Sequence, residues 1–101
     1  MEFMVKEGEE TRITLDGKLD FARAPLLMEA LMALKGKAIS TILFECKALT
    51  YISSAGIRAI LYAHQKISPG VGIIMEDVNK DVQEALDMCG FYDYIEFSVS
   101  S

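Results

Sequence analysis

The first third of the chain begins with two segments in which apolar and polar residues alternate. Residues 3–7 and residues 11–15 each show this pattern, which is typical of a strand with one buried face. The polar residues 8–10 join the two segments, so we expect an antiparallel hairpin. Asp16 and Gly17 follow the second segment and are expected to end its strand, because both residue types favour turns.

Three later segments are also predicted to be strands. Residues 39–46 and residues 71–75 are apolar at consecutive positions, as in a central strand that is covered on both faces. Residues 94–99 alternate again and predict a last strand. Residues 47–52, which follow the first apolar run, are expected to form a loop.

Helical spacing separates these strands. In residues 24–34 the apolar positions recur every three or four residues, and the same spacing predicts helices over residues 55–67 and 80–89. Asn79 is a suitable N-cap for the third helix, and Gly90 is suitable for its C-terminal end. The residues of this helix expected to face the core are Val82, Ala85, Leu86 and Cys89.

The predicted fold class is therefore α/β, in a single domain over residues 1–101 with the order β-β-α-β-α-β-α-β. Strands separated by helices imply parallel pairing through right-handed crossovers, whereas the first hairpin adds an antiparallel pair. We expect a mixed sheet with helices packed against it.

The charge of the chain excludes a nucleic-acid-binding surface. There are 10 Lys and Arg residues against 15 Asp and Glu residues, which gives a net charge of −5. Binding to a phosphate backbone needs a basic stripe, and the sequence has none. An acidic domain favours solubility or a partner with basic docking residues.

Cysteine and histidine are too few for a structural zinc site. The chain has Cys46, Cys89 and His64, whereas such a site usually takes four ligands. Both cysteines lie among apolar residues, so we expect two buried thiols in a reducing compartment. Neither a secretory leader nor an apolar run of about 18 residues is present, which predicts a cytoplasmic protein that does not insert into a membrane.

One segment could carry chemistry, at the start of the second predicted helix. Residues 51–57 bring Ser53 and Ser54 to the point where a central strand gives way to a helix. Ligands of open α/β sheets bind at this edge, and the first turn of a helix has unpaired N–H groups. Ser54 is expected to be the N-cap, and Gly56 lets a backbone or a phosphate approach closely. A serine before a helix can also be a cap and nothing more.

Motifs for catalysis and nucleotide binding are absent from the sequence. No serine has histidine and aspartate at a spacing that indicates hydrolysis, and neither of the common glycine-rich phosphate-binding motifs occurs. We expect a protein that is not an enzyme, with no catalytic residues, cofactor or metal.

Four landmarks follow one another along the chain: residues 17–20 (Gly-Lys-Leu-Asp), the apolar strand 41–44 with residues 49–51, the segment 52–57 (Ile-Ser-Ser-Ala-Gly-Ile), and residues 86–91 (Leu-Asp-Met-Cys-Gly-Phe). In this order they resemble the STAS domain, the fold of bacterial anti-sigma factor antagonists. Together with Phe97 they extend over most of the chain.

The resemblance implies a partner-switching protein. Members of the family bind an anti-sigma factor that is also a serine kinase, and so release the sigma factor for transcription. The kinase phosphorylates a serine at the start of the second helix, which separates the complex, and a phosphatase resets the switch.

The family pattern assigns roles to particular residues. It is often Asp-Ser-[Ser/Thr]-Gly, which places Ser54 at the phosphoacceptor position, with Ser53 in place of the Asp and as the second choice of acceptor. Ala55 replaces the second hydroxyl residue. The expected partner-binding residues are Asp20, Ser53, Ser54, Ala55, Gly56 and Arg58. Asp20 could instead serve only as a turn or cap, and Arg58 could be part of a solvated helix face.

Two other functions stay open. The domain could be a STAS subunit that supports a transport or other signalling complex without being phosphorylated. A small enzyme is the third class, which would need paired titratable groups in a polar cavity.

Overall fold

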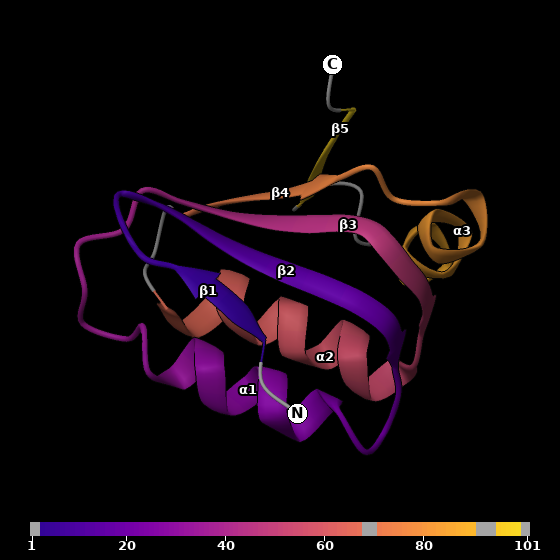
Figure 1. The fold of residues 1–101 in the computed structure, drawn as a ribbon, viewed down its shortest axis with the longest axis horizontal. Helices are drawn as coiled ribbons and strands as arrows, with labels where there is room; N and C mark the ends of the chain where they lie inside the picture. The colour runs from indigo at the N-terminus through magenta and orange to yellow at the C-terminus, as the bar shows by residue number, and fades with distance from the viewer. Residues whose placement is uncertain (1–2, 68–70, 91–94, 100–101) are drawn as a thin grey trace.

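A computed structural model describes residues 3–67, 71–90 and 95–99 and shows a single five-stranded sheet (Figure 1). Its strands lie side by side in chain order: β1 (Met4–Lys6), β2 (Glu10–Leu19), β3 (Thr41–Ile52), β4 (Gly72–Glu76) and β5 (Ile95–Ser98). β1 and β2 pair antiparallel, while the remaining neighbours pair parallel. The predicted mixed sheet and element order are confirmed.

The helices are α1 (Ala24–Met32), α2 (Ser54–Tyr62) and α3 (Lys80–Met88), and a π-helical turn, η1 (Ala63–Ile67), continues α2. In Figure 1, α1 and α2 lie together under one face of the sheet, whereas α3 lies beside the carboxyl end of β3. A hydrogen bond of 3.0 Å from the Asn79 side chain to the carbonyl of Leu49 joins the start of α3 to β3. Asn79 also caps α3 as predicted, since its side chain accepts from the N–H of Val82.

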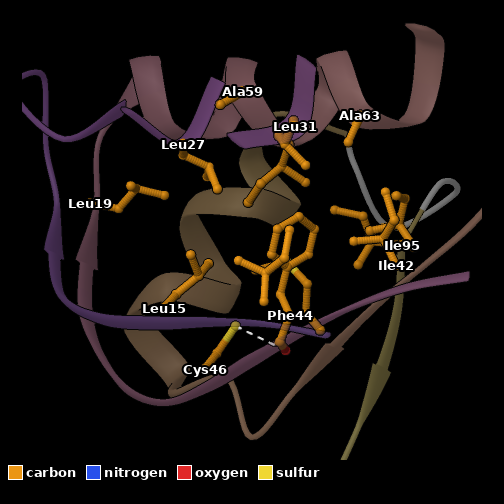
Figure 2. Packing of buried hydrophobic residues seen from close by; sticks show 14 of the residues in the cluster. Leu15, Leu19, Leu27, Leu31, Ile42, Phe44, Cys46, Ala59, Ala63 and Ile95 are labelled. Atoms are coloured by element: carbon orange, nitrogen blue, oxygen red, sulfur yellow. Dashed lines mark hydrogen bonds between the residues drawn. The ribbon is translucent and has the colours of Figure 1, made fainter. Parts of the chain in front are cut away.

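The core fills the space between the sheet and this helical layer (Figure 2). Leu27 and Leu31 of α1 point toward Phe44 of β3, and all three are fully buried. Removing apolar area of this kind from water contributes roughly 25 cal/mol per Å² and is the main term that holds the layers together.

The expectation that the two apolar runs are covered on both faces holds only in part. In β3, Ile42 and Phe44 join the core and Leu43 is buried, but Glu45, on the same face as Leu43, is half-buried. In β4, buried residues alternate with more exposed ones.

Two expectations about the strands were wrong. β2 does not end at Asp16–Gly17, and residues 47–52 form the second half of β3 instead of a loop. The two errors have one cause, because the extended halves of β2 and β3 pair with each other as far as Leu19 and Ile52. Register shifts at Asp16 and between Gly17 and Lys18 absorb the irregularity, and Gly17 takes a positive φ of 60°.

The helix boundaries also differ from the pattern. α1 ends at Met32, two residues before the predicted residue 34, and α2 passes into η1 before the predicted end at residue 67. Cys89 was expected to face the core but is exposed, because α3 ends at Met88 and Cys89 lies in the turn that follows. Only Cys46 is a buried thiol, and burial raises its pKa to about 12. The expected strand residue Tyr94 and the motif residue Phe91 lie outside the described residues.

Candidate functional site

The junction between β3 and α2 is held by the side chain of Ser53. Ser53 has extended backbone (φ −89°, ψ 170°), and its Oγ accepts a hydrogen bond of 3.2 Å from the N–H of Gly56. This geometry makes Ser53 the N-cap of α2, so the expectation that Ser54 is the cap was wrong. β3 ends at Ile52 and α2 begins at Ser54, so the helix starts one residue earlier than the predicted residue 55.

Ser53 also ties the start of α2 to the end of β2. Its N–H and its Oγ both donate to the carbonyl of Leu19, at 2.9 Å and 3.0 Å. The residue is only 2% exposed, and its hydroxyl is engaged both as donor and as acceptor. Ser53 is therefore a structural link whose oxygen is not presented to solvent.

Ser54 has the opposite environment. It is the first residue of α2 and is exposed. Arg58, one helical turn along, lies beside it: Nη2 is 3.5 Å from the Ser54 Oγ, and Nε is 3.4 Å from the Ser54 carbonyl oxygen. The first turn of the helix also carries the positive end of the helix dipole, which favours negative charge at this position.

Gly56 is required by packing against the end of the sheet. A Cβ atom at Gly56 would lie 2.9 Å from Cγ of Leu19 and 3.0 Å from Cγ1 of Ile52. The closeness expected at this glycine is present, and the atoms that approach it belong to two buried side chains. Gly56 therefore lets the first turn of α2 lie against the ends of β2 and β3.

Asp20 organises the neighbouring turn that leads into α1. Its Oδ1 accepts hydrogen bonds of 3.1 Å from the N–H groups of Ala22 and Arg23. Asp20 directly follows Leu19, the residue that Ser53 contacts. The hydrogen bonds of its carboxylate go to the backbone of the turn that Asp20 begins. The structure shows the turn role that the sequence left open.

A shallow, mainly apolar hollow of about 440 Å³ lies beside Ser54, between the starts of α1 and α2. Phe21, one of the residues that line it, is 65% exposed. On the other side of the junction, Tyr51 is 48% exposed and borders a second hollow, of about 260 Å³, between β3 and α3. Tyr51 belongs to the segment that the sequence singled out, whereas Phe21 was missed, although a large apolar side chain directly after the predicted turn at Asp20 was a usable signal. The residues that line the first hollow are Phe21, Ala24, Pro25, Met28, Ala55 and Arg58.

Within residues 3–67, 71–90 and 95–99, no group of three or more His, Cys, Asp or Glu side chains is placed to hold a metal ion. None of the helices in this described part has the length and apolar character needed to cross a bilayer.

The fold and the junction together define a class of protein. It is a mixed α/β domain in which a central strand leads directly into a capped helix, with a serine exposed at the first helical position. A family model for the STAS domain matches residues 3–101, and the chain belongs to this family. No curated protein matches the sequence.

Solved structures share the fold at low sequence identity. An anti-sigma factor antagonist from Mycobacterium paratuberculosis superposes with a TM-score of 0.83 at 14% identity, over 95% of this chain and 83% of that one. The anti-sigma factor antagonist SpoIIAA in its unphosphorylated form gives 0.75 at 16% identity, over 98% and 88%. The STAS domain of a SulP transporter from Vibrio cholerae gives 0.61 at 16% identity, over 85% and 70%. These similarities establish the fold and the predicted order of its elements.

Proposed function

We propose that this domain is an anti-sigma factor antagonist that binds an anti-sigma factor with serine kinase activity and is released by phosphorylation of Ser54. The observation that carries the proposal is the contrast between two adjacent serines. Ser53 is buried with its hydroxyl engaged, whereas Ser54 is exposed at the first position of α2. One hydroxyl is therefore presented at the place where the family pattern has its phosphoacceptor.

The surface around Ser54 suits a protein partner. We define the docking surface as Phe21, Met28, Ser54, Ala55 and Arg58, which surround or border the apolar hollow. Aromatic residues, methionine and arginine are enriched in protein interfaces, and this surface has one of each. The kinase-bearing anti-sigma factor would cover this surface and so be kept from its sigma factor.

The modification is a phosphoryl transfer from ATP held by the partner kinase. The Ser54 Oγ forms a bond to the γ-phosphorus while the bond between that phosphorus and the β,γ-bridging oxygen breaks, which releases ADP. The hydroxyl proton passes to a base of the kinase. A phosphatase reverses the modification with water, which takes the phosphoryl group and regenerates the serine.

Phosphate on Ser54 would separate the complex without unfolding the domain. It adds a charge of about −1.5 to −2, which the start of α2 tolerates because the helix dipole stabilises an anion there by roughly 0.3–1 kcal/mol. An apolar contact cannot accept this hydrated dianion without a desolvation penalty. A penalty of about 3 kcal/mol weakens binding on the order of 100-fold, which is enough for a switch.

The test uses the anti-sigma factor kinases encoded in the source genome, each purified and titrated against the domain by calorimetry. We expect Ser54→Ala to bind like the wild type but to gain no mass on incubation with ATP. Ser54→Asp should bind at least tenfold more weakly. Gln65→Glu adds one negative charge at an exposed position of η1 and is the matched control, expected to bind like the wild type. Equal affinities for Ser54→Asp and Gln65→Glu would contradict the proposal.

A second function is favoured by one observation, the shared fold of the SulP transporter STAS domain. In that case the domain supports a larger complex through the same surface without being phosphorylated. Intact mass spectrometry of the protein purified from its own cells distinguishes the two: a fraction heavier by one phosphate that is absent from Ser54→Ala supports the switch, and its complete absence supports the scaffold.

A further inference from the structure

The guanidinium of Arg58 is placed to contact a group attached to the Ser54 Oγ. The two residues are separated by four positions on α2, so their side chains lie on one face of the helix. The guanidinium already approaches the serine through two nitrogens, Nη2 at 3.5 Å from Oγ and Nε at 3.4 Å from the carbonyl oxygen. Both distances are long for hydrogen bonds, so the contact in the unmodified protein is weak.

The charge of Arg58 is available, unlike that of the other two arginines. Arg12 pairs with Glu45 at 2.5 Å, and Arg23 pairs with Asp16 at 2.7 Å. Within the part of the chain that the structure describes, no carboxylate lies within 4.0 Å of Arg58. The guanidinium is exposed and borders the apolar hollow of the docking surface.

We propose that Arg58 is the built-in receptor for a phosphate on Ser54, and that pairing with this phosphate withdraws the guanidinium from the docking surface. The proposal rests on the proposed function in taking Ser54 as the modified residue. A phosphoserine offers three strong acceptor oxygens, and the planar fork of a guanidinium binds two of them at once. The weak contact to a neutral hydroxyl then becomes a charge-assisted, bidentate pair.

This pairing changes the docking surface in two ways. The phosphate adds negative charge beside Ala55, and the hollow loses the cation that the unmodified protein presents there. The added charge disfavours an apolar contact with a partner, and both changes together disfavour a contact with acidic groups. The switch is then set by a residue of this chain as well as by the charge of the phosphate itself.

The experiment needs no partner protein. Phosphoserine is placed at position 54 during translation, and the second pKa of its phosphate is measured by ³¹P NMR in the wild type, Arg58→Lys and Arg58→Gln. We expect that pKa to be about 0.3–0.7 unit higher in Arg58→Gln than in the wild type, which is the size of an exposed ion pair. Arg58→Lys should lie between them, because an ammonium cannot form the bidentate pair. The difference should shrink in 1 M salt.

Lys66→Gln is the matched control, because it removes the same charge from an exposed position of η1. Along a helix it lies about 18 Å from residue 54, beyond the screening length of roughly 8–10 Å, so its phosphate pKa should equal that of the wild type. In the wild type, the Arg58 Nε–H signal should shift when the phosphate is present.

Equal phosphate pKa values in the wild type and Arg58→Gln would overturn the proposal. So would equal changes in Arg58→Gln and Lys66→Gln, or an Arg58 Nε–H signal that does not move. Arg58 is exposed, so the amide spectrum of Arg58→Gln should show the native fold. The absence of any kinase for Ser54 would defeat the proposed function but leave these measurements unchanged, so the two failures are distinguishable.

Discussion

At the scale of single residues, the junction depends on three neighbours of very different kinds. Ser53 is buried and doubly hydrogen-bonded, Ser54 is exposed, and Gly56 leaves room for Leu19 and Ile52. The two serines are adjacent and of the same residue type, and only the direction in which the chain leaves β3 decides their roles. The sequence could place a serine cap at this junction but could not choose between the two.

Gly56→Ala should destabilise the domain by roughly 1–3 kcal/mol, because its Cβ would lie within 3.0 Å of the packed side chains of Leu19 and Ile52. Urea unfolding followed by circular dichroism measures this change in the free energy of unfolding. Gly72→Ala is the matched control: it also has no positive φ, and its Cβ would have no neighbour closer than 3.9 Å. An equally large loss in Gly72→Ala would contradict the assignment of the effect to packing.

At the scale of elements, the sheet is irregular near its joint with α2, where the register between β2 and β3 shifts twice. Arg23, just before α1, donates to the carbonyls of Asp16 and Lys18 and pairs with the Asp16 carboxylate. Its guanidinium also lies 4.9 Å from the centre of the Phe3 ring. Arg23 thus fixes the irregular part of β2, so that the carbonyl of Leu19 is held where Ser53 can donate to it.

Ser53→Ala removes two hydrogen bonds at once: the one that caps α2 and the one from the serine hydroxyl to β2. Loss of an N-cap typically costs about 1 kcal/mol, and leaving a buried acceptor with one bond fewer adds to this, so we expect a total loss of roughly 1–3 kcal/mol. The free energy of unfolding in urea is the measurement. Ser54→Ala makes the same chemical change at an exposed position and should alter stability by less than about 0.5 kcal/mol. Equal losses in the two variants would show that Ser53 is not the cap.

At the scale of the whole molecule, one charged group makes stability depend on pH in the acid range. A hydrogen bond from Thr14 and the pair with Arg12 lower the pKa of Glu45 on β3. A carboxyl whose pKa is lowered by folding stabilises the native state at pH values above its pKa in the unfolded chain. This contribution disappears as the pH falls through its pKa in the native state. Because both charged side chains are more than a third exposed, the effect is limited by solvent screening.

Glu45→Gln should therefore be less stable than the wild type at neutral pH, by a few tenths to about 1 kcal/mol. The difference should shrink as the pH is lowered through and below 4.5, the ordinary pKa of a glutamate. Thermal unfolding at a series of pH values measures it. Glu29→Gln makes the same charge change at an exposed position of α1. A parallel acid dependence in both variants would show that the ion pair on the sheet is not its source.

The sequence by itself determined the order of the elements, the parallel sheet with its first hairpin, and the inward faces of the strands and helices. These follow from local spacing, because a strand repeats every two residues and a helix every 3.6. Ile13 and Leu15, the apolar positions of the alternating segment 11–15, are fully buried. Family landmarks placed the site at the start of α2 for the same reason, since they are local patterns.

Only the tertiary structure decided the details of that site. The second halves of β2 and β3 stabilise each other as strands although each was expected to be irregular, because the hydrogen bonds that hold them come from residues far apart in sequence. That extension moves the start of α2, makes Ser53 the cap and leaves Ser54 with Arg58 at the surface. Local spacing carries no information about long-range pairing, which is why the sequence found the site but could not assign its two serines.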